Sequence, residues 1–186
     1  MKPIKSTTII FTMVFFCIHT DNFALPPRIR SEKCSIIFSP ESPWKELGLK
    51  KEPFEKTNGK PTLVAQITFK KRLKDPVNLN SLKLRWHGPI IDHIFGSLYK
   101  KDPEKEFLPL QHNLVCDGVW NKAEQSLILN FDMKQKLSAT NIFCLVFDIS
   151  PEIQDLLKQG NFTLYEDTLP DVFKSCARSQ TLILRC

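Results

Sequence analysis

The 186-residue chain is poor in glycine, tyrosine and tryptophan, with 6 Gly, 2 Tyr and 3 Trp against 13 Pro and 14 Phe. This composition excludes collagen-like and low-complexity sequences. Hydrophobic residues make up 42% and charged residues 25%, which is typical of a globular protein and not of a disordered one. The length predicts one domain with a core of its own.

Several catalytic and cofactor-binding motifs are also missing. The sequence has no CxxC, HxH, HExxH, GxSxG or GxxxxGK[ST] pattern. These absences argue against a zinc ribbon, a thioredoxin-like redox pair, a zinc protease, an α/β-hydrolase nucleophile and a phosphate-binding loop. Paired carboxylates of the glycosidase type stay open, because their partners lie far apart in sequence. We therefore expect no cofactor and favour a protein without enzymatic activity.

Basic residues exceed acidic ones, giving a formal net charge of +6. They are scattered in short groups at 50–51, 70–74 and 100–101, and acidic residues interrupt them. A nucleic-acid-binding protein would concentrate them in one stripe. We therefore expect no nucleic-acid partner, and interpret the groups as solvated surface with a mild preference for anionic partners.

The first 24 residues have the layout of a secretory signal peptide. Lys2 and Lys5 precede an apolar run at 7–18, and Ala24 is a suitable last residue before cleavage. The run is shorter than a membrane-spanning helix requires, although an uncleaved N-terminal anchor is the alternative. No later segment is long enough to span a membrane. These features predict a secreted, periplasmic or extracellular protein with no transmembrane segment after cleavage.

Five cysteines follow that segment, and export would allow them to oxidise. An odd number predicts two disulfides and one free thiol. The ten-residue spacing of Cys176 and Cys186 favours a bridge that holds the C-terminal segment. A second bridge would join Cys116 to Cys144, although Cys144 lies in an apolar run that also suits a buried thiol.

Alternating apolar and polar residues dominate the rest of the chain. The pattern predicts strands at 62–70, 81–87, 112–120, 126–133, 141–150, 161–167 and 180–186. The strand at 112–120 is interrupted by a bulge or tight turn at Asp117-Gly118. One short helix is predicted at 151–160, where Pro151 begins it and Gly160 ends it.

We therefore predict an all-β fold, an antiparallel β-sandwich of the immunoglobulin-like or jelly-roll-like kind. Its expected divisions are a signal peptide at 1–24, an extended and irregular N-terminal arm at 25–60, and the sandwich at 61–186.

Two of the chain's four histidines lie in the segment RWHGPIIDHIFGSLY at 85–99. His87, Asp92 and His93 suggest a metal-assisted site, with His112 as a further ligand. Adjacent residues of a strand point to opposite faces, however, so Asp92 and His93 would not readily share a ligand. We favour a strand–turn–strand corner over a metal site, and we expect no bound metal.

Two further residues are candidates for the protein surface. Trp120 stands beside Asn121-Lys122 at the end of a hairpin, so we expect its ring to be exposed and to form a binding surface with His87 and His93. Asn161-Phe162-Thr163 matches the N-glycosylation sequon.

The leading functional hypothesis is an exported, non-enzymatic β-sandwich that binds a protein or glycan at a cell surface or in an envelope space. The alternatives are a secreted hydrolase or metal-assisted enzyme built on His87, Asp92 and His93, and a secreted modulator of a host or competitor that uses its odd cysteine for intermolecular bridging. The pattern leaves the oligomeric state open.

Overall fold

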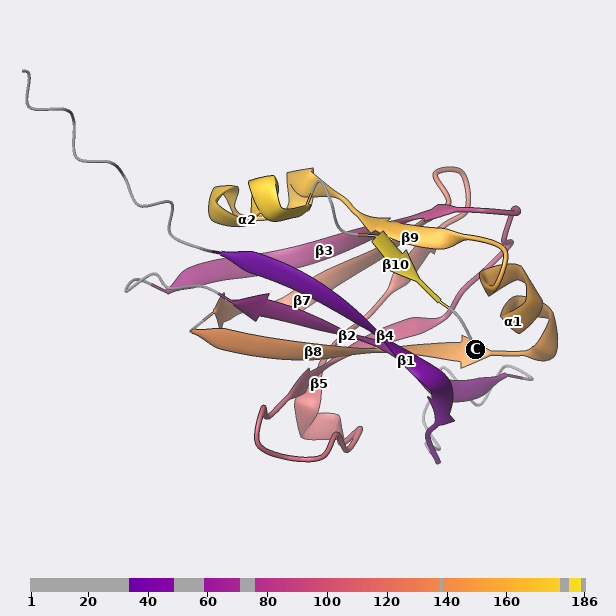
Figure 1. Cartoon of the computed structure of the whole chain (residues 1–186), viewed down its shortest axis with the longest axis horizontal. Coiled ribbons are helices and arrows are strands. Elements are labelled where there is room, and N and C mark those ends of the chain that lie inside the picture. The colour runs from indigo at the N-terminus through magenta and orange to yellow at the C-terminus, as the bar shows by residue number, and fades with distance from the viewer. Residues whose placement is uncertain (1–33, 49–58, 71–75, 138, 178–180, 185–186) are drawn as a thin grey trace, which may run out of the picture. The chain divides into compact units, whose positions relative to one another are not determined.

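The computed structural model describes residues 34–48, 59–70, 76–137, 139–177 and 181–184. The segment expected to be a signal peptide lies outside these residues. In the described part, two antiparallel five-stranded sheets form a β-sandwich, as predicted (Figure 1). None of the helices in these ranges is long and apolar enough to cross a membrane.

Sheet A contains five strands in the spatial order β1-β2-β8-β4-β5. Their bounds are β1 Ser35–Glu46, β2 Lys60–Lys70, β8 Thr140–Ile149, β4 Gly96–Lys101 and β5 Leu114–Asp117. The predicted strand at 141–150 is confirmed as β8, at the centre of this sheet. Its side chains are buried on both faces, which explains why its sequence is apolar without alternation.

Sheet B has the spatial order β10-β9-β3-β7-β6. Its strands are β10 Thr181–Ile183, β9 Asn161–Leu164, β3 Val77–His87, β7 Ser126–Leu137 and β6 Val119–Asn121. The inward residues of β3 are Leu82, Leu84 and Trp86, which are at most 3% exposed. They alternate with half-buried or exposed residues, so the period-two pattern of this strand correctly predicted its core face.

β7 follows its predicted alternation only at first. Leu127 and Leu129 are fully buried, but Met133 is 77% exposed. The register between β3 and β7 shifts between Leu79 and Ser81, where β7 contains extra residues. This irregularity turns Met133 away from the face that the sequence pattern gives it.

The predicted strand at 112–120 is two strands in different sheets. β5 ends in sheet A at Asp117, and β6 begins in sheet B at Val119. Gly118 connects the two strands across the sandwich, and its N–H donates to the Gly96 carbonyl at 2.7 Å. A Cβ at this glycine would lie 2.7 Å from Leu127 Cδ1 and 3.1 Å from the Gly96 carbonyl oxygen, so any larger residue would displace the fully buried Leu127 side chain.

The described residues contain two α-helices where one was expected. α1, Pro151–Leu157, is the predicted helix, and the Ser150 side chain caps it by accepting the Ile153 N–H at 3.3 Å. α2, Asp171–Ala177, was not predicted. Its buried residues Phe173 and Ala177 have the i, i+4 spacing of a helix face, but the helix is too short for periodicity to reveal.

Part of the predicted N-terminal arm belongs to the sandwich. Residues 35–46 form β1, which pairs antiparallel with β2 at the edge of sheet A. Ile36 of this strand is 1% exposed and packs in the main core. Strand β1 therefore places residues of the predicted arm, 25–60, within sheet A.

Candidate binding site

The connection between β4 and β5, residues 102–113, lies against the face of sheet A that points away from sheet B (Figure 1). Phe107 anchors it with an edge-on contact to Tyr99, and the two ring centroids are 5.9 Å apart. Around this contact lies a small apolar cluster separate from the main core. Its buried members are Leu47, Leu63, Tyr99, Phe107, Cys144 and Val146.

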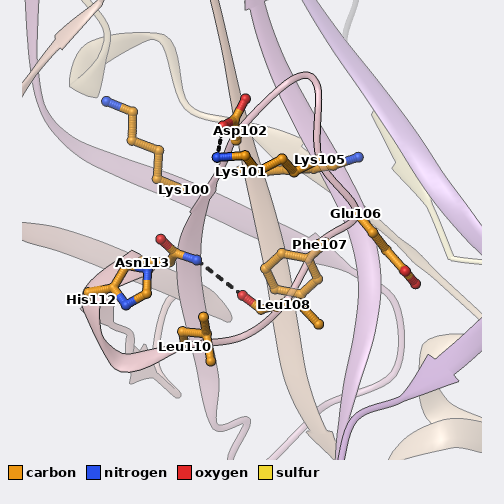
Figure 2. Close-up of a pocket in the computed structure, with 10 residues that line it drawn as sticks. All are labelled: Lys100, Lys101, Asp102, Lys105, Glu106, Phe107, Leu108, Leu110, His112 and Asn113. Carbon is orange, nitrogen blue, oxygen red and sulfur yellow. Dashed lines mark hydrogen bonds and ion pairs between the residues drawn. The ribbon is translucent and has the colours of Figure 1, made fainter.

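Local hydrogen bonds shape the same connection. Asp102 Oδ1 accepts the Glu104 N–H at 3.1 Å and so forms a turn directly after β4. Asn113 Nδ2 donates to the Leu108 carbonyl at 3.2 Å, which links the two halves of the loop (Figure 2). The 3₁₀ turn η2, Gln111–Asn113, then leads into β5. The loop thus has a defined conformation over its apolar anchor.

A cavity of about 420 Å³ opens between the end of β4 and this loop (Figure 2). A second hollow, of about 400 Å³, shares Lys100, Lys101 and His112 with it and extends to Thr140 and Asn141 of β8. We call these two hollows together the basic groove. Beside the lysines stand Leu108 and Leu110, which are 56% and 45% exposed.

The carboxylates of the groove are already paired. Glu106 forms an ion pair with Lys45 of β1 at 3.0 Å, and Asp102 forms one with Lys105 at 3.1 Å. The backbone N–H of Glu104 and the Lys105 ammonium hold the pKa of Asp102 below its usual value. In the described residues neither Lys100 nor Lys101 forms an ion pair, so these two cations give the groove its positive character.

Beneath the loop, the Tyr99 hydroxyl is buried with no hydrogen-bond partner in the described residues. The residue is 1% exposed. Burial, and secondarily the charge of Asp117, raise the pKa of Tyr99 to about 12. An unpaired buried hydroxyl costs folding free energy, whereas a phenyl ring of the same shape does not.

Tyr99→Phe is therefore expected to increase the free energy of unfolding by about 1 kcal/mol in urea titrations at neutral pH. The wild-type protein should also lose stability as the pH rises from about 10 to 12, because the unfolded phenol ionises first. The Tyr99→Phe protein should lose less stability than the wild type over that pH range. Tyr165→Phe, at a half-buried ring whose centroid lies 4.7 Å from Lys83 Nζ, is the control and should change stability by less than about 0.5 kcal/mol. A less stable Tyr99→Phe protein would contradict this account.

The segment at 85–99 is a strand–turn–strand corner that crosses between the sheets, from β3 in sheet B to β4 in sheet A. Its three candidate ligands point to different neighbours. His87 Nε2 lies 2.8 Å from Thr163 Oγ1, Asp92 pairs with Lys122 at 2.5 Å, and the His93 ring packs on Phe95 with centroids 4.0 Å apart.

His112 lines the basic groove, and none of the other three candidate ligands does. Among the residues that the structure describes, no three His, Cys, Asp or Glu side chains are close enough to hold a metal ion. The geometry therefore gives no support to the metal-assisted enzyme.

Trp120 is not an exposed binding residue, contrary to the expectation from its place in a hairpin. It is 8% exposed and belongs to the main core. Its indole Nε1 donates to the Ile91 carbonyl at 3.1 Å. The partner lies 29 residues away, so the local sequence could not reveal that the polar edge of this ring is satisfied inside the protein.

The expected bridge between Cys116 and Cys144 is not formed. Both thiols are free, and strand β4 separates β5, which carries Cys116, from β8, which carries Cys144. Cys116 pairs in register with Leu98 and Cys144 with its neighbour Tyr99, so the two thiols point to opposite faces of sheet A. Burial raises the pKa of each thiol to about 12, which makes both unreactive at neutral pH.

The other expected bridge, from Cys176 to Cys186, includes a residue outside the described ranges. Cys176 itself lies on α2. The sequon residue Asn161 is half-buried at the start of β9, between His87 and Ile183 of the neighbouring strands.

Sequence reasoning missed the residues that give the basic groove its character. In the sequence, Lys100 and Lys101 look like any other solvated lysine pair. A signal did exist in Phe107, Leu108 and Leu110, three apolar residues in a connection that should otherwise be polar.

Comparison of the chain with protein families, with curated proteins and with solved structures finds no match.

Proposed function

We propose that the chain is an exported, non-enzymatic binding module of a cell surface, envelope or extracellular space, and that it binds an acidic, partly apolar segment of a partner protein in the basic groove. The observation that carries the proposal is the pair Lys100 and Lys101, which lines a cavity of about 420 Å³ without carboxylate partners in the described part of the chain. Export is proposed from the N-terminal sequence pattern.

Charge favours an acidic ligand. Because Asp102 and Glu106 are engaged by Lys105 and Lys45, an incoming carboxylate would meet two lysines whose charge is not neutralised nearby. The chain's net positive charge would add long-range attraction and speed association at low salt.

The leucines favour a protein segment over a glycan. Leu108 and Leu110 are large apolar side chains exposed at the rim of the cationic site, and apolar groups of a peptide could cover them. A glycan site usually offers an exposed aromatic ring to a sugar face. Phe107, which lines the groove, is only 7% exposed.

The proposal predicts that a fluorescent peptide of alternating glutamate and leucine binds the full-length chain, with weaker binding at physiological than at low ionic strength. Lys100→Glu combined with Lys101→Glu should weaken binding by about tenfold or more, measured by fluorescence anisotropy. The matched control is Lys134→Glu with Lys136→Glu. It makes the same charge change at two exposed positions of β7, and it should weaken binding much less.

Two outcomes would contradict the proposal, one for the site and one for the ligand. An equal loss in the two double variants would mean that only net charge matters. Groove-dependent binding of a sulfated polysaccharide, without binding of the peptide, would identify an acidic glycan as the ligand instead.

A further inference from the structure

Cys34 and Cys176 lie side by side although 142 positions separate them in sequence. The thiol of Cys176 donates to the Cys34 carbonyl oxygen at 3.0 Å. Cys34 directly precedes β1, and Cys176 lies in the last turn of α2, which contacts β1 (Figure 1). Both cysteines are half-buried and pack against the edge of the main core.

The elements that carry them are firmly anchored. Phe173 of α2 is fully buried and makes an edge-on contact with Phe69 of β2, with ring centroids 5.3 Å apart. Cys176 follows three residues later, on the same face of the helix. On the other side, Ile36 is 1% exposed and fixes the start of β1. The approach of the two cysteines therefore follows from core packing.

From this geometry we propose that Cys34 and Cys176 form a disulfide when the protein meets a disulfide oxidant. A carbonyl oxygen is so close to its own Cα that Cys176 Sγ must lie within about 5.5 Å of the Cα of Cys34. The bridge therefore requires the Cys34 side chain to turn toward α2 and the residues before β1 to adjust until the two sulfurs meet. Cys116 and Cys144 are unsuitable partners, because they are buried in sheet A on opposite faces.

The chemistry is two steps of thiol–disulfide exchange with a small disulfide such as oxidised glutathione. One cysteine thiolate attacks a glutathione sulfur, which forms a mixed disulfide and releases one glutathione thiolate. The second cysteine thiolate then attacks the protein sulfur of that mixed disulfide. The bond between Cys34 Sγ and Cys176 Sγ forms, the second glutathione leaves, and the two glutathione thiolates take up the two protons.

Peptide mapping of the full-length chain tests the bridge directly. After treatment with oxidised glutathione, alkylation and digestion without reduction, we expect a peptide pair joined through Cys34 and Cys176. Cys186→Ser is the matched control and should retain that pair, whereas Cys34→Ser should lose it. The midpoint of thermal unfolding should fall by about 10 °C on reduction in the wild-type and Cys186→Ser proteins, but not in Cys34→Ser.

A bridge from Cys176 to Cys186, or alkylation of both Cys34 and Cys176 after oxidation, would overturn the inference. If Cys34→Ser does not fold, mapping of the wild-type and Cys186→Ser proteins still decides the question. The inference does not rest on the basic groove. Because the oxidant is added to purified protein, a missing Cys34–Cys176 bridge would not bear on the proposed ligand.

Discussion

Phe162→Ala is expected to lower the free energy of unfolding by about 3–5 kcal/mol. Phe162 of β9 is fully buried, with its ring centroid 5.0 Å from that of Trp86 and 5.6 Å from that of Phe147. Trp86 belongs to sheet B and Phe147 to sheet A. The phenyl ring thus packs between the sheets, and its removal would leave a cavity that neither sheet can fill.

Urea titration followed by circular dichroism measures this loss. Met133→Ala is the control, because Met133 is 77% exposed and should contribute less than about 0.5 kcal/mol. A loss below about 1 kcal/mol in Phe162→Ala would show that the three rings do not form a contact between the sheets.

Gly160→Ala should cost about 3 kcal/mol, at the upper end of the range for an overpacked core. A Cβ at Gly160 would lie 2.4 Å from Trp86 Cη2 and 2.5 Å from the His87 carbonyl oxygen. Neither atom can easily move. The carbonyl oxygen belongs to the backbone of β3, and the Trp86 indole is buried and donates its N–H to the Pro89 carbonyl at 2.7 Å. The cause is steric, because Gly160 does not have a positive φ angle.

Gly48→Ala provides the matched control, since a Cβ there would meet no atom of the described residues within 4 Å. It should leave the urea midpoint nearly unchanged. In a Trp86→Phe background, the smaller ring should relieve part of the clash, so the cost of Gly160→Ala should fall. Equal costs in the two backgrounds would indicate that Trp86 is not the obstacle.

The strands were predictable where burial alternates along the chain, as in β3, or covers a whole strand, as in β8. The prediction was wrong where a distant contact decides the outcome. Trp120 is buried because Ile91 supplies its hydrogen-bond acceptor. Met133 is exposed because the register of β7 shifts against β3. Neither effect leaves a trace in the neighbouring sequence.

The candidate site was even less predictable, because its character comes from pairings between distant segments. Lys45 on β1 neutralises Glu106, which leaves Lys100 and Lys101 as the charges that matter in the groove. The sequence shows only that basic and acidic residues are mixed at 100–106. Cys34 and Cys176 are likewise neighbours only because α2 packs beside β1.

The small apolar cluster beneath the β4–β5 connection has an evolutionary consequence. Because Phe107 and Tyr99 support the loop outside the main core, substitutions at the groove's rim, such as at Leu108 or Leu110, leave the inter-sheet packing intact. Related sequences could therefore diversify this loop and acquire new ligands while the sandwich that presents it is preserved.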